Sequence, residues 1–114
     1  MKLAFVYYPV KDLPGALEFY RDVLGLEVAW RMGEAIGLNI PDSQAGVLID
    51  SYEPNGPRRA GAVFEVDSVD AFWEEHHTRL RFVQEPMDVP GGRWAIFLDP
   101  SGNEVRITDE SRPV

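Results

Sequence analysis

The stretch that decides the fold is FLDPSGNEVRITD, residues 97–109. Its DPSG run has the residues of a type I turn, with Asp first, Pro second and Gly last. The residues that follow, 103–108, alternate in polarity, which predicts a strand. Arg106 stands between Val105 and Ile107, so alternation places its guanidinium on the strand face opposite the two apolar side chains.

Composition limits the classes of protein to which the chain could belong. A length of 114 residues favours one domain, and the absence of cysteine excludes a disulfide framework and a thiolate metal site. The net charge of −8 argues against a nucleic-acid partner. It agrees either with a cationic ligand or with simple solubility. No long apolar run or signal peptide is evident, so no membrane is expected and a cytoplasmic location is the default.

The order of predicted elements occurs twice along the chain. The first module, residues 1–52, has a strand at 3–10, a helix within 12–25, and strands at 26–32, 35–40 and 45–52. A polar linker at 53–59 follows. The second module, residues 60–110, has a strand at 60–66, a helix within 67–80, and strands at 81–85, 93–98 and 103–108. This pattern predicts a duplicated βαβββ unit within a single domain, 1–114.

The predicted fold class is α+β. We expect two βαβββ modules to form a cup-shaped, mostly antiparallel eight-stranded sheet with the helices on the outside. Strand alternation then divides each strand into residues that pack on a helix and residues that face the cup. The predicted cup residues include Phe5 and Tyr7 on the first strand, Gly61 and Glu65 on the fifth, and Arg106 on the last.

Two segments resemble a known family. VKDLPGALEFYRDVLGLEV, residues 10–28, is similar to the opening of the vicinal oxygen chelate superfamily, which includes glyoxalase I, bleomycin resistance proteins and extradiol dioxygenases. PGGRWAIFLDPSGNEVRI, residues 90–107, resembles its closing segment. The resemblance covers essentially the whole chain and implies the duplicated fold.

The resemblance also implies where the metal ligands of the metal-dependent members would lie. Carried over one by one, these positions fall on Phe5, Leu48, Gly61 and Arg106, with Asp50 in place of Leu48 if the register slips. Phe and Leu offer no lone pair, Gly has no side chain, and Arg carries a positive charge. We therefore expect no metal and no cofactor. A replacement metal site of Tyr7, Asp50, Glu65 and Glu104 is the alternative.

Several residues are candidates for ligand binding. Phe5, Tyr7, Trp30 and Trp94 are interpreted either as a stacking surface for a flat ligand or as ordinary packing. Arg106 is interpreted either as the partner of Glu65 in a structural ion pair or as a fork for a ligand's carboxylate or phosphate group. The predicted ligand-binding set is Phe5, Tyr7, Trp30, Leu48, Asp50, Gly61, Glu65, Trp94 and Arg106, and no residue is predicted to be catalytic.

The functional prediction is a metal-free binding protein that sequesters an aromatic or cationic small molecule without transforming it. The similarity to the bleomycin resistance branch implies antibiotic resistance as a role and a homodimer as the assembly. The alternatives are a metal-dependent glyoxalase-like lyase or dioxygenase with non-standard ligands, and a non-catalytic interaction module. A metal-independent enzyme with Glu65 as general base is a further alternative.

Overall fold

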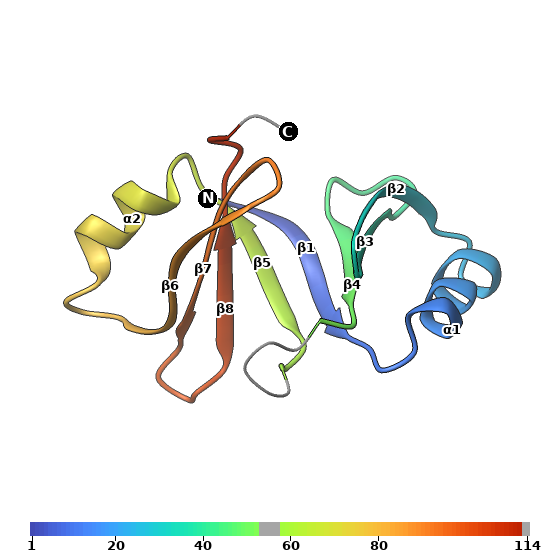
Figure 1. Ribbon diagram of the computed structural model, residues 1–114, viewed down its shortest axis with the longest axis horizontal. Coiled ribbons are helices and arrows are strands. Elements are labelled where there is room, and N and C mark those ends of the chain that lie inside the picture. The colour runs from blue at the N-terminus through green and yellow to red at the C-terminus, as the bar shows by residue number, and fades with distance from the viewer. Residues whose placement is uncertain (53–57, 113–114) are drawn as a thin grey trace. The chain divides into compact units, whose positions relative to one another are not determined.

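The computed structural model describes residues 1–52 and 58–112 (Figure 1). Its contacts divide the chain into two compact units. We call residues 4–60 the N-terminal unit, and residues 1–3 together with 61–114 the C-terminal unit. The predicted linker, residues 53–59, lies mostly outside the described residues. The assignment of the whole chain to one domain stays a prediction.

The N-terminal unit has the order strand–helix–three strands. Its elements are β1 (Lys2–Pro9, from residue 4 onwards), α1 (Leu13–Leu17), the π-helical turn η1 (Glu18–Val23), β2 (Glu27–Met32), β3 (Ala35–Asn39) and β4 (Gly46–Asp50). Its strand order is β2-β3-β4-β1, in which β1 pairs with β4 in parallel and the other pairs are antiparallel. The Asp12 side chain caps α1 by accepting from the Gly15 N–H at 3.1 Å.

The C-terminal unit repeats this order. Its elements are β5 (Gly61–Glu65), α2 (Val69–His76), β6 (Arg81–Val89), β7 (Gly92–Leu98) and β8 (Glu104–Thr108). The strand order is β5-β8-β7-β6, and β5 pairs with β8 in parallel. Four of the six strand pairs described within the units are antiparallel. The predicted fold class, α+β with two βαβββ modules and mostly antiparallel strands, is confirmed.

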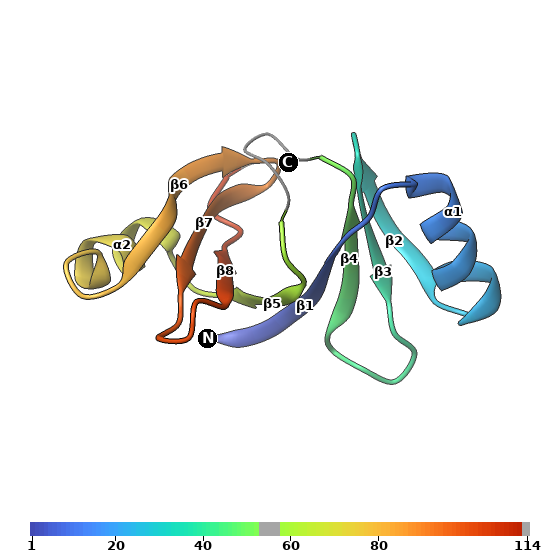
Figure 2. The same ribbon diagram turned by 90° about the horizontal axis from the view of Figure 1, so that it is seen from below.

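In each unit one helix covers one face of the strands (Figure 2). The N-terminal core joins Leu13 of α1 to Ile36, Leu38, Val47 and Ile49 of the sheet. The C-terminal core joins Val69 of α2 to Ala95, Phe97 and Ile107. Because side chains alternate along a strand, the residues between these core positions point to the other side of the sheet. We call that side the helix-distal face of each unit.

Two local predictions are wrong in instructive ways. The helix predicted within residues 12–25 is not α-helical throughout, and Leu24 near its end is 53% exposed. The helix turns π-helical, with the Leu24 N–H donating to the Phe19 carbonyl, so the extra residue in this turn shifts Leu24 off the inner helix face. Strand β6 continues to Val89 rather than ending at 85. Pro86 is tolerated there because β6 is at the edge of the sheet and its pairing is bulged.

Candidate ligand-binding face

The residues predicted for the ligand site in the N-terminal unit share its helix-distal face. Trp30 pairs with Gly37, Gly37 with Leu48, and Leu48 with Tyr7, so these four residues form one row across the sheet. Phe5 and Asp50 lie two residues from this row on β1 and β4, and therefore on the same face. Strand register and alternation together thus place five of the predicted residues on one face.

The aromatic side chains on this face touch one another. The rings of Phe5 and Trp30 meet edge to face, with centroids 5.9 Å apart. The Trp30 indole lies across Gly37, where a Cβ atom would be only 2.7 Å from Trp30 Cζ2. Gly37 therefore makes room for the indole. Gly37 was not among the predicted site residues, although a glycine within the apolar run AIGL indicates close approach of another group.

Asp50 places a partly buried carboxyl group beside the aromatic side chains. Its Oδ2 is 3.4 Å from the Tyr7 hydroxyl, and its Oδ1 accepts from the Tyr52 N–H at 2.9 Å. Burial raises the pKa of Asp50 above its ordinary value, the two hydrogen bonds oppose this rise, and the nearby Glu34 carboxylate adds to it. The folded protein therefore disfavours the charged form of the Asp50 carboxyl group on this face.

The C-terminal unit brings its predicted residues to the corresponding face. Val63 pairs with Arg106, Arg106 with Ile96, and Thr108 with Trp94. Gly61 and Glu65 lie two residues either side of Val63 and share its face. Trp94 and Glu65 are half-buried, whereas Arg106 is 0% exposed. A guanidinium this deeply buried is part of the unit's interior.

Arg106 forms its buried ion pair with a residue other than the one predicted. Its Nη2 lies 2.8 Å from Oε1 of Glu104, two residues back along β8, and the Glu104 side chain is 13% exposed. The predicted partner, Glu65, instead pairs with Lys2 Nζ at 3.3 Å. The prediction failed because alternation along one strand puts positions i and i+2 on the same face, which makes Glu104 the nearer carboxylate.

The four positions carried over from the metal-dependent family members do not fit a metal ion. Phe5 and Leu48 share one helix-distal face, and Gly61 and Arg106 share the other. None of these four side chains offers a lone pair to a metal ion, and Arg106 carries a positive charge. Within residues 1–52 and 58–112, no three Asp, Glu or His side chains are grouped so that they could hold a metal. Tyr7 and Asp50 lie close together, but this pair alone does not make a site.

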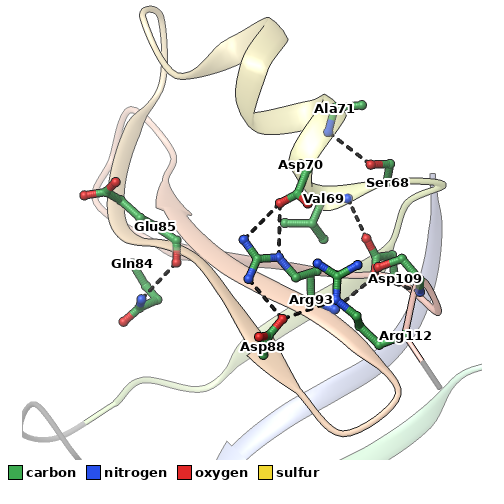
Figure 3. Close-up of polar contacts among 11 residues, drawn as sticks. Ser68, Val69, Asp70, Ala71, Gln84, Glu85, Asp88, Arg93, Asp109 and Arg112 are labelled. Atoms are coloured by element: carbon green, nitrogen blue, oxygen red, sulfur yellow. Dashed lines mark hydrogen bonds and ion pairs between the residues drawn. The ribbon is translucent and has the colours of Figure 1, made fainter. Parts of the chain in front are cut away.

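A second polar cluster supports the C-terminal unit from the helix side (Figure 3). The Arg93 guanidinium binds Asp70 of α2 and Asp88 of β6, each at 3.1 Å. Arg93 also helps to line a shallow groove of about 440 Å³, together with Asp70, Trp73, Glu74, Glu85 and Pro86. None of the predicted site residues lines this groove, and the charge of Arg93 is already balanced by the two carboxylates.

The duplicated βαβββ order, with one helix-distal face in each unit, defines a class of two-module α+β proteins. The match of the sequence to a family model then identifies the family. The chain belongs to the glyoxalase/bleomycin resistance protein/dioxygenase superfamily, whose family model matches residues 2–107. The chain has no match among curated protein sequences. No helix in the described parts of the chain is both long and apolar enough to cross a membrane.

Solved structures with the same fold share little sequence with this chain. Methylmalonyl-CoA epimerase from Mycobacterium tuberculosis is 20% identical, with a TM-score of 0.74 over 97% of this chain and 89% of the epimerase. A glyoxalase/bleomycin resistance protein/dioxygenase superfamily member from Vibrio splendidus 12B01 is 17% identical, with a TM-score of 0.61 over 93% and 96%. At these identities the similarity establishes the fold.

Asp50→Asn is expected to stabilise the protein at pH 7, by less than about 1 kcal/mol. A carboxyl whose folded-state pKa is raised favours folding when protonated, and it loses that contribution as pH rises from the unfolded pKa through the folded one. The gain from the amide should therefore vanish below about pH 4. Urea unfolding of both proteins from pH 3.5 to 8 measures this difference.

The matched control is Asp99→Asn. Hydrogen bonds, first from the Asn103 side chain, lower the pKa of Asp99, so its contribution to stability is present above the unfolded pKa and lost as pH falls through the folded one. The two variants should therefore shift stability in opposite directions at pH 7. A loss of stability at pH 7 in Asp50→Asn would contradict the inference that burial makes the charged form of Asp50 unfavourable in the folded protein.

Proposed function

We propose that the chain binds a small organic molecule that carries an aromatic or cationic group, and that it does so without a divalent metal ion. The observation that carries the proposal is the helix-distal face of the N-terminal unit. There the contacting rings of Phe5 and Trp30 share one surface with Tyr7 and the Asp50 carboxyl group. Aromatic faces attract flat rings and cations, and a carboxylate adds charge complementarity.

Each predicted residue has a particular role on the helix-distal face of its own unit. The half-buried Trp30 and Phe5 supply the apolar contact surface. Leu48 and Tyr7 are 6% and 3% exposed and belong to the interior of the unit, where the Tyr7 hydroxyl donates to the Asp50 carboxyl group. The C-terminal unit has a helix-distal face of its own, on which Glu65 and Trp94 are half-buried. Arg106 and Gly61 shape that face from within, since the guanidinium is fully buried against Glu104.

Binding of this kind requires affinity alone. Stacking, exclusion of water and one or two charge contacts hold the ligand, and no bond in it is broken. A role in antibiotic resistance by sequestration, a homodimeric assembly and a cytoplasmic location are parts of the same proposal. They are supported by the similarity to bleomycin resistance proteins and by the acidic charge of the chain.

A ligand panel tests the proposal directly. Purified protein is screened by thermal shift against aromatic cations, including glycopeptide antibiotics, against neutral quinones, and against acyl-CoA thioesters as an anionic class. We expect the aromatic cations to raise Tm and the thioesters to have no effect. Stabilisation by acyl-CoA alone would contradict the proposed ligand class. An unresponsive panel would instead support the interaction-module alternative.

Trp30→Ala and Asp50→Asn are each expected to weaken the binding of an aromatic cation about tenfold. Loss of the indole removes the stacking surface, and loss of the carboxylate removes its charge complement, each worth about 1–2 kcal/mol. Isothermal titration calorimetry with the strongest hit of the panel measures both effects. Phe19→Ala is the matched control, because this aromatic side chain is 48% exposed on η1. Equal losses of binding affinity in all three variants would refute the proposed ligand site on the N-terminal unit.

Metal content is measured independently of the ligand. Elemental analysis of protein purified without chelators should find less than about 0.1 equivalent of Zn, Ni, Mn or Fe, since the four carried-over positions offer no donor. Stoichiometric metal would favour the alternative of a metal-dependent lyase or dioxygenase with non-standard ligands. A metal-free protein that converts a bound ligand would instead favour the metal-independent enzyme.

A further inference from the structure

Gly61 and Arg106 lie against each other in the C-terminal unit. They are on the adjacent parallel strands β5 and β8, where Val63 is the register partner of Arg106. A Cβ atom built on Gly61 would be 3.1 Å from Arg106 Nη1 and 3.0 Å from the Glu104 carbonyl oxygen. Both distances are tighter than ordinary van der Waals contacts, so a side chain at position 61 requires the guanidinium or the Glu104 carbonyl to shift by a few tenths of an ångström.

The guanidinium has little freedom to move aside. Glu104 holds Nη2 at 2.8 Å, and Arg106 is 0% exposed. Its register partners on either side, Val63 and Ile96, are 0% and 3% exposed. A charged group in these surroundings cannot give up its acceptor without a large cost in free energy. The space beside Gly61 is therefore filled by a fixed positive charge.

We propose that Gly61 and Arg106 are a single coupled replacement of two metal-ligand positions. The Arg106 guanidinium occupies the volume that a donor side chain at position 61 would need, and its charge repels a cation from the same place. A donor side chain at position 61 is therefore incompatible with Arg106 in the C-terminal unit. The inference rests on the metal-independent part of the proposed function and gives it a structural cause.

A double-mutant cycle tests the coupling. Gly61→His, Arg106→Ala and the double variant are compared with the parent protein by urea unfolding of the full chain. We expect Gly61→His to increase the unfolding equilibrium constant strongly in the parent. In the Arg106→Ala background, Gly61→His should increase the unfolding equilibrium constant by a factor that is at least about ten times smaller. Equal fold-changes in the two backgrounds would overturn the proposal.

Gly61→Ala provides the same comparison if Gly61→His does not fold in the parent. The added methyl group meets the Glu104 carbonyl in both backgrounds but meets the guanidinium only when Arg106 is present. Gly61→Ala should therefore increase the unfolding equilibrium constant less in the Arg106→Ala background than in the parent protein. Gly37→Ala is the control, because its methyl group would meet Trp30 in the other unit. Its fold-change should be the same in both backgrounds.

The cycle is measured on ligand-free protein, so its result is separate from that of the ligand panel. Additive effects would overturn the coupling while leaving the proposed ligand site intact. Stoichiometric metal in the parent protein would overturn metal independence without making the effects of the two substitutions additive.

Discussion

Asp109→Ala is expected to destabilise the protein by about 3–5 kcal/mol. The Asp109 carboxylate accepts four hydrogen bonds, from the Val69 N–H at 2.7 Å, the Arg93 N–H at 2.9 Å, and the Ser111 N–H and hydroxyl at 3.1 and 2.6 Å (Figure 3). It joins the start of α2 to β7 and to the chain that leaves β8. Alanine would leave these donors unsatisfied in a region where Asp109 is only 5% exposed.

The stability contributed by Asp109 should also depend on pH. Burial disfavours the charged form, but the hydrogen bonds, led by that from the Ser111 side chain, outweigh burial and lower the pKa of Asp109. A lowered folded-state pKa contributes stability that is present above the unfolded pKa, about 3.9, and is lost as pH falls through the folded value. The difference between parent and variant in urea unfolding should therefore shrink in acid.

Glu110→Ala is the matched control for this prediction, since Glu110 is the exposed neighbour of Asp109. It should change the free energy of unfolding by less than about 0.5 kcal/mol. A similarly small change in Asp109→Ala would mean that the carboxylate does not hold these elements together.

Gly92→Ala is expected to destabilise the protein by about 3 kcal/mol. A Cβ atom on Gly92 would overlap the backbone carbonyl of Asp109 and lie 2.7 Å from its Oδ1. Both neighbours are fixed, because the Asp109 side chain is hydrogen-bonded on several sides and its N–H donates to the Arg93 carbonyl. The methyl group can be accommodated only if β7 and the end of β8 separate.

Gly25→Ala distinguishes this steric effect from the general effect of replacing glycine. Gly25 has a φ of +80°, but no atom lies within 4 Å of a Cβ built there. Its replacement should cost about 1 kcal/mol, from the left-handed backbone alone. Thermal and urea unfolding of the two variants measures the difference, and equal costs would refute the steric explanation.

Periodicity was enough to predict the fold and the sharing of faces. Alternation placed Tyr7 opposite the helix, and the repeated order of elements predicted two units of the same topology. The π-helical turn at Glu18–Val23 was not predicted because its residue pattern does not distinguish it from an α-helical turn. The strand predicted at 81–85 ends too early because the sequence does not show which strand is at the edge of the sheet, where a proline such as Pro86 is tolerated.

The partners of the charged side chains were harder to predict than their faces. Arg106 was paired with Glu65 on another strand because both face the same way, yet distance favours Glu104 on the same strand. Gly37, Gly92 and Asp109 were missed for a related reason. Their importance depends on contacts between segments far apart in sequence, and residue type alone does not reveal these contacts.

The parallel pairing of the first and last strands within each unit has a consequence for folding kinetics. Phe5 pairs with Gly46, and Val63 with Arg106, so about 40 residues separate the partners in both cases. Closing such long loops is entropically costly, and it slows folding relative to a helical protein of the same length. During synthesis on the ribosome each sheet stays incomplete until its final strand emerges. The N-terminal unit can then fold first, while the strands of the C-terminal unit are still being made.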